Sequence, residues 1–99
     1  MNRKIYENLD KSLTKTIMEL WTDIRESVFK ENESLAEFKN TKPDELSDYH
    51  YGLGLYLRNN ILIPDSEIYL KFIENGILQR DDMSSAMLIL WHTALQKNN

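Results

Sequence analysis

Four polar residues in the second half of the sequence could bind an anion or take part in acid–base chemistry. His50 and Arg58 flank the segment YGLGLYL, and Asp81 and Asp82 follow further along the chain. On a helix His50 and Arg58 would occupy positions i and i+8, so the two side chains would lie on one side with a gap between them. The gap could hold a small anionic group or the backbone of a partner.

A second interpretation of the same residues is structural. Arg58 could form a charge-assisted pair with Asp81 or Asp82 at the start of the last helix and so dock two helices together. We favour this interpretation, because an arginine that ends one helix and an acid that opens another satisfy the free groups at both helix ends. The candidate ligand- or partner-binding residues are His50, Arg58, Asn59, Asn60, Asp81 and Asp82.

The motifs of nucleophilic and phosphate chemistry are missing from the sequence. It contains no GxSxG segment, and its GLG segment lacks the third glycine and the lysine of a phosphate-binding loop. Asp81 and Asp82 are adjacent and would point in different directions, which suits helix capping better than paired acid–base catalysis. We therefore predict no catalytic residues and a protein that is not an enzyme.

Metal and cofactor sites are not predicted either. His50 and His92 are the only histidines, there is no cysteine, and no HExxH spacing occurs. Asp48 and His50 would point to different sides of a helix. His92 shares a polar stripe with Ser85 and Gln96, which predicts an exposed or hydrogen-bonded edge of the last helix.

The net charge of −4 is concentrated in residues 19–48, where nine acids stand against four basic residues, a local balance of −5. Nucleic acid is an unlikely partner for such a surface, because phosphates are bound through clustered Lys and Arg. The acids could instead bind a basic protein, or form a solvated face that keeps the protein soluble. The candidate acidic face comprises Glu19, Asp23, Glu26, Glu31, Glu33, Glu37, Asp44, Glu45 and Asp48.

The length of 99 residues and the apolar content of 41% predict one packed globular domain. The longest apolar run, 86–91, is too short to cross a bilayer, and the first residues carry charges where a signal peptide needs an apolar stretch. Together with the absence of cysteine, this predicts a cytoplasmic protein with no membrane contact. The oligomeric state is left open.

Apolar residues recur at steps of three and four in residues 1–30, which predicts one long amphipathic helix or two joined near Thr22. They are Ile5, Leu9, Leu13, Ile17, Leu20, Trp21, Ile24 and Val28. Residues 31–43 form an acidic connector with few apolar side chains, a short amphipathic turn or helix that Pro43 ends.

Residues 44–60 admit two interpretations. The alternation of Tyr and Leu from Tyr49 to Leu57 would suit a half-buried strand, but the absence of β-branched residues and a cap at Asp44 or Ser47 favour a helix. Gly52 and Gly54 would weaken that helix, so they need a packing reason, which we take to be the close approach of another helix backbone. Asn59 and Asn60 would stop the helix in the left-handed conformation.

Two further helices complete the prediction. Asp65 or Ser66 caps the first, Asn75-Gly76 ends it, and Asp81-Asp82 open the second, which is apolar on all sides over 86–91. We expect an all-α fold, a single compact bundle of four or five helices with the last helix central and buried. Residues 1–99 form one domain, with motif-bearing helices in 44–99.

The motifs HYGLGLYLRNN and GILQRDDMSS resemble those of a family of small bacterial helical domains of uncharacterised function. The resemblance covers roughly the second half of the chain. This sequence departs from the family pattern at ILIPDS, where a tryptophan-containing loop is usual, and at Gln79-Arg80, where a proline is usual. The resemblance implies an all-helical fold and links Arg58-Asn59 to the two aspartates. It implies no reaction.

These observations lead to two functional hypotheses. The first is a non-enzymatic interaction domain, an immunity-type or adaptor protein of a bacterium, whose acidic face binds a basic protein such as a toxin encoded nearby. The second is a small-ligand or sensing domain that uses His50, Arg58 and the Asp81-Asp82 turn.

Overall fold

The computed structural model describes residues 9–97, and within them every regular element is helical. This confirms the all-α prediction, but the described residues form six helices rather than four or five. The elements are α2 (Lys11–Ser27), α3 (Asn32–Asn40), the 3-10 helix η1 (Pro43–Tyr49), α4 (Leu53–Asn60), α5 (Glu67–Glu74) and α6 (Arg80–Lys97).

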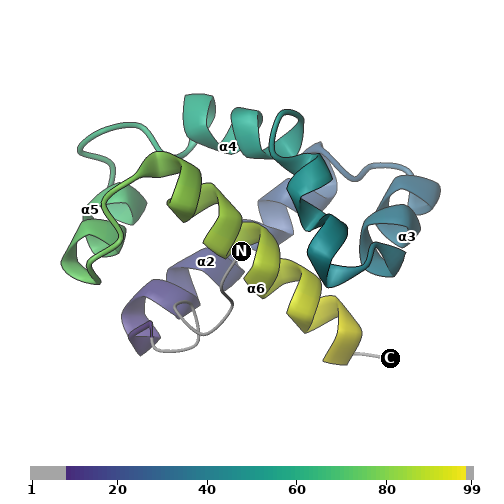
Figure 1. The fold of residues 1–99 in the computed structure, drawn as a ribbon, viewed down its shortest axis with the longest axis horizontal. Coiled ribbons are helices and arrows are strands. Elements are labelled where there is room, and N and C mark those ends of the chain that lie inside the picture. The colour runs from purple at the N-terminus through teal and green to yellow at the C-terminus, as the bar shows by residue number, and fades with distance from the viewer. Residues whose placement is uncertain (1–8, 98–99) are drawn as a thin grey trace.

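Helix α6 is the centre of the fold, as predicted. It crosses the middle of the molecule in Figure 1 and packs against α2, α3, η1, α4 and α5. Its side chains are buried on several sides, and Trp91 is fully buried. The radius of gyration of 12.6 Å is close to the value of about 13 Å expected for a compact chain of this length.

The N-terminal pattern forms one continuous helix over its described part, not two joined near Thr22. The side chain of Asp10 caps α2 by accepting a hydrogen bond from the backbone N–H of Leu13 at 2.8 Å. Its buried positions are Leu13, Ile17, Trp21 and Ile24, which belong to the predicted apolar stripe. Val28, also predicted to be part of it, is exposed and lies beyond the last residue of α2. Ile5 lies outside the described residues, and the predicted acidic connector contains α3.

Residues 44–60 are neither a strand nor the single helix that we predicted. Pro43 opens η1, which has no side-chain cap, and the chain then turns over 50–52 before α4 begins at Leu53. Gly52 precedes α4 with φ −95° and ψ −94°, outside the helical region. Residues 50–52 form a turn rather than a helix, and the carbonyl of His50 accepts a hydrogen bond from the Arg58 side chain.

The predicted helix ends are partly correct. Ser66 caps α5, and Gly76 ends it with a positive φ of 82°, as predicted. Asn59 and Asn60, in contrast, lie within the last turn of α4 and are not left-handed. Helix α4 ends at Asn60, and just beyond it the backbone amides of Ile61 and Leu62 both donate to the carbonyl of Leu57.

Candidate functional site

Arg58, in the last turn of α4, is a charged side chain held in the core at 8% exposure. Its Nε lies 3.3 Å from Oδ1 of Asp81 at the start of α6. Nη1 donates to Oγ of Ser84 at 3.1 Å, and Nη2 donates to the carbonyl of His50 at 3.1 Å. All three guanidinium nitrogens therefore have partners, and Arg58 joins α4 to α6 and to the turn before α4, as the docking interpretation predicted.

The gap expected between the imidazole and the guanidinium is closed. Nη1 of Arg58 lies 3.5 Å from Nδ1 of His50. A guanidinium only donates, so Nδ1 of His50 is the acceptor side of this long contact. The two side chains lie on one side, as predicted, but neither the predicted gap nor the helical reason for it is correct: His50 is not in α4, and the turn at 50–52 brings it to Arg58.

Gly54 provides the space for the Arg58 side chain. A Cβ atom at this position would lie 3.1 Å from Nη1 of Arg58 and 3.2 Å from the carbonyl oxygen of Tyr49. The close approach that we predicted for this glycine is confirmed, although its neighbours are a side chain and the end of η1 rather than another α-helix. Gly52 has open space around it, so the same reason does not apply there.

Replacement of Gly54 by alanine is expected to lower the free energy of unfolding by about 1 kcal/mol, although alanine favours helix by a similar amount. Neither neighbour can retreat easily, because one is backbone and the other is fixed by three partners. Urea denaturation measures the change. The matched Gly52→Ala variant should stay close to the unsubstituted protein, and a more stable Gly54→Ala variant would contradict the packing role.

Arg58 forms a cluster with its contacting residues, among them His50 and Asp81. The remaining candidate residues lie outside this cluster. Asn59, Asn60 and Asp82 are exposed, and Asn60 donates to the carbonyl of Tyr56 within α4. The structure thus brings together His50, Arg58 and Asp81 but not the other three. Even Asp81 keeps 70% of its side chain exposed, so water can reach the acidic side of the cluster.

Two members of the cluster were not among the predicted site residues. Ser84 is buried, and its hydroxyl donates to the carbonyl of Asp81 at 3.0 Å while it accepts from Arg58. Its position three residues after Asp81, on the same side of a helix, was the available signal. Arg80 donates from Nη1 to the carbonyl of Arg58 at 3.4 Å, which satisfies a group at the end of α4.

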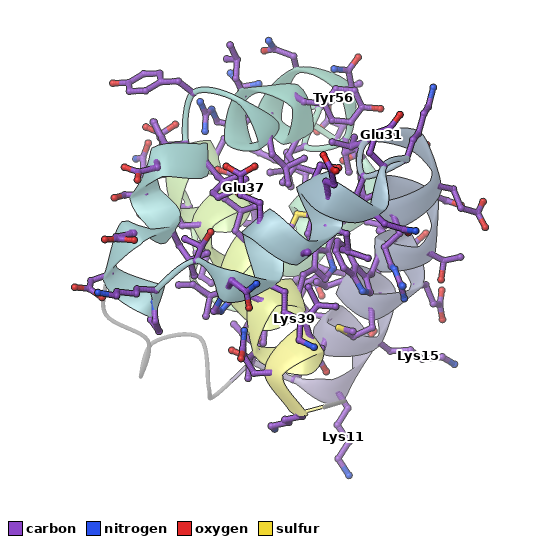
Figure 2. The ribbon with its side chains drawn as sticks, turned by 90° about the vertical axis from the view of Figure 1, so that its right-hand side faces the viewer. Lys11, Lys15, Glu31, Glu37, Lys39 and Tyr56 are labelled. Atoms are coloured by element: carbon purple, nitrogen blue, oxygen red, sulfur yellow. The ribbon has the colours of Figure 1, made fainter. Side chains whose placement is uncertain are left out.

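The nine acids of the candidate acidic face are all exposed. Glu19 lies 4.0 Å from Lys15, and the other eight form no ion pair within residues 9–97. Figure 2 shows Glu31 and Glu37 in one half of the face that carries α3, whereas Lys11, Lys15 and Lys39 lie in the other half. The acids are not all apart from the lysines, however, because Glu19 lies beside Lys15.

Three of these acids share a groove of about 460 Å³ between α3 and η1. Glu37 contributes from α3, and Glu45 and Asp48 contribute from η1. Tyr49 lines the same groove, and its ring packs edge-on against the buried Phe38 with centroids 5.1 Å apart. Acidic and polar side chains line the groove together with the aromatic ring of Tyr49.

His92 has a structural position. It is 2% exposed, and its Nε2 lies 2.7 Å from the carbonyl of Thr41, beyond the end of α3. Nδ1 has no partner among the described residues, and the ring packs edge-on against Phe38. We predicted that His92 would be exposed or hydrogen-bonded at an edge of the last helix. It is hydrogen-bonded, but it is buried and does not lie at an edge.

No group of three or more His, Asp or Glu side chains between residues 9 and 97 has a geometry that could hold a metal ion. In the same residues, no helix combines the length and the apolar character needed to cross a membrane.

Comparison with known proteins places the chain in a family. Searches of curated proteins and of solved structures find no match. The model of one family, described as a domain of unknown function (DUF6794), matches residues 11–95. The match includes α2 to α5 and nearly all of α6, so it extends well beyond the half of the sequence that carries the motifs. The chain therefore belongs to the DUF6794 family of domains of unknown function.

Proposed function

We propose that this chain is a non-enzymatic interaction domain that binds a basic protein through its acidic face. The observation that carries the proposal is the exposure of all nine acids, of which eight have no ion pair within residues 9–97. Like charges held together without counterions repel one another, and a cationic partner relieves this repulsion.

The negative charge of the acidic face indicates that its partner is a positively charged protein. Binding is steered by long-range attraction, so association is fast and weakens as salt is added. An immunity-type or adaptor protein of the bacterial cytoplasm, with a basic toxin encoded nearby, has these properties. The absence of cysteine fits a reducing compartment.

The alternative of a small-ligand or sensing domain has less support. Its central residue, Arg58, already uses its three nitrogens within the fold, and His50 closes the gap that a ligand would need. A ligand would have to displace those partners before it gained any contact. The arrangement is typical of a structural link between helices.

The interaction proposal predicts a specific effect of charge reversal. A Glu37→Lys/Glu45→Lys variant should bind the basic product of a neighbouring gene about tenfold or more weakly, because two attractive charges become repulsive. Titration calorimetry at several salt concentrations measures the affinity, and the variant should also show a shallower dependence on salt.

The control for this experiment carries the same charge change elsewhere. A Glu67→Lys/Glu74→Lys variant alters two exposed acids of α5, outside the acidic face, and should bind nearly as well as the unsubstituted protein. Equal weakening in the two variants would indicate a general charge effect and count against a defined face. Failure of every neighbouring gene product to bind, at any ionic strength, would overturn the proposal.

A further inference from the structure

The end of α5 carries Asn75, the one asparagine in the sequence that a glycine follows. The backbone nitrogen of the next residue can attack an asparagine side chain, and the reaction is fastest before glycine, which has no side chain to obstruct the approach. Gly76 is exposed, Asn75 is partly exposed, and open space surrounds the position of a Cβ atom at Gly76. Water and base can therefore reach the bond between the two residues.

The reaction converts the side-chain amide of Asn75 to an acid in two steps. The nitrogen of Gly76 bonds to Cγ of Asn75, the bond from Cγ to Nδ2 breaks, and ammonia leaves with the proton of the Gly76 nitrogen. Water then opens the cyclic imide at one of its two carbonyls. The product is an aspartate, or an isoaspartate in which the backbone runs through Cγ, and in both cases residue 75 gains a negative charge.

Hydrogen bonds hold both reacting groups in the folded protein. The backbone N–H of Gly76 donates to the carbonyl of Ile73 at 3.0 Å. Oδ1 of Asn75 accepts from the backbone N–H of Asp10 at 3.0 Å, and Nδ2 donates to Oδ2 of Asp10 at 3.3 Å and to the carbonyl of Lys71 at 2.8 Å. The side chain must give up these bonds before Cγ can turn toward the nitrogen of Gly76. The reaction therefore waits for an opening of the helix end, and frayed ends are among the parts of a fold that open most readily.

The contacts of Asn75 also join α5 to α2, and the two helices pack against each other (Figure 1). Asp10 is the N-cap of α2, where its Oδ1 accepts from the backbone N–H of Leu13 at 2.8 Å. After the reaction residue 75 lacks Nδ2, the donor to both Asp10 and the carbonyl of Lys71. Its new carboxylate lies against the carboxylate of Asp10, and like charges this close repel each other.

We propose that Asn75-Gly76 is a site of spontaneous deamidation that becomes reactive when the end of α5 opens, and that its product loosens the contact between α5 and α2. The fold protects the site as long as the helix end is closed. Because the change is irreversible, the protein loses stability with time, at a rate set by how often this end opens. The inference does not depend on the basic partner proposed above, since neither Asn75 nor Asp10 belongs to the acidic face.

Mass spectrometry of the whole chain, incubated in mildly alkaline buffer with and without guanidinium chloride, measures the rate, and peptide mapping locates the product. It should form at Asn75 before Asn59 or Asn60. It should form about tenfold or more slowly in the folded protein, because the reaction waits for the opening. Equal rates in the two conditions overturn the proposal, as does an amide at Asn75 that persists in guanidinium.

Asp10→Ser tests whether Asp10 holds the site closed. Serine caps a helix as well as aspartate does, but its shorter side chain cannot reach Nδ2 of Asn75. The folded variant should therefore deamidate several times faster than the unsubstituted protein, and the two rates should be equal in guanidinium. Lys11→Ser, at the exposed next position, is the control and should leave the rate unchanged. An Asp10→Ser variant that reacts as slowly as the unsubstituted protein overturns this role of Asp10.

Asn75→Asp reproduces the new charge and the loss of Nδ2. Its melting temperature should fall by about 5 °C. Asn59→Asp makes the same change at an exposed position in the last turn of α4 and should melt within about 2 °C of the unsubstituted protein. Equal melting of the two variants overturns the loosening. In the Asp10→Ser background Asn75→Asp should cost less, because the opposing carboxylate is gone.

Discussion

Replacement of Arg58 by alanine is expected to lower the free energy of unfolding by about 2–3 kcal/mol, one of the two largest effects predicted for this protein. The substitution leaves the carbonyl of His50 and the hydroxyl of Ser84 without their donors and empties the space that Gly54 provides. For a domain of this size the melting temperature should fall by about 10 °C or more. Thermal and urea denaturation measure the two quantities.

The controls for Arg58→Ala divide the effect among its contacts. Asp81→Asn removes only the ion pair, and because the Asp81 side chain is 70% exposed it should cost less than about 1 kcal/mol. Asp82→Asn should have no effect beyond a small change at the start of α6. If Arg58→Ala melts within a few degrees of the unsubstituted protein, the cluster is not a structural link, and the small-ligand hypothesis gains support.

Replacement of Trp91 by alanine should be the most destabilising single change, with a loss of about 4 kcal/mol. The Trp91 side chain is fully buried and stacks on Trp21 with ring centroids 5.2 Å apart. Its indole N–H donates to the carbonyl of Ile17 at 2.9 Å, so the substitution also removes a buried hydrogen bond between α6 and α2. Guanidinium denaturation followed by circular dichroism measures the loss.

The conservative variant keeps this prediction measurable if Trp91→Ala does not fold. Trp91→Phe retains an aromatic ring against Trp21 and loses the hydrogen bond to Ile17 and part of the volume, so it should cost about half as much. Leu95→Ala, at a half-buried position on the same helix, should cost less than either. Equal stability of Trp91→Phe and the unsubstituted protein would show that neither the hydrogen bond nor the missing volume matters.

Much of the fold could be predicted from local patterns. The apolar stripe of α2, the apolar run of α6 and the cap at Ser66 each depend on residues within a few positions of one another. So does the stop at Gly76, where a positive φ suits a residue without a Cβ. These features need no knowledge of distant neighbours, which is why the predictions for them hold.

The segment 44–60 could not be predicted in this way. Apolar spacing allowed a strand or a helix, but the chain instead forms η1, a turn and α4. The turn exposes the carbonyl of His50 to the guanidinium of Arg58, whose other partners, Ser84 and Asp81, lie on the distant helix α6. Asn59 and Asn60 likewise remain helical because the chain beyond them is held by packing, which outweighs their preference for a helix stop.

The sequence by itself determined the helical class, both ends of α5, the start of α6 and the concentration of acids in residues 19–48, since each follows from neighbouring residues or from composition. It also indicated that Arg58 would meet an aspartate. Only the tertiary structure decided that Ser84 and the carbonyl of His50 complete the cluster. The physical reason is that a side chain is buried, paired or exposed according to the elements packed against it. Those elements come from distant parts of the chain.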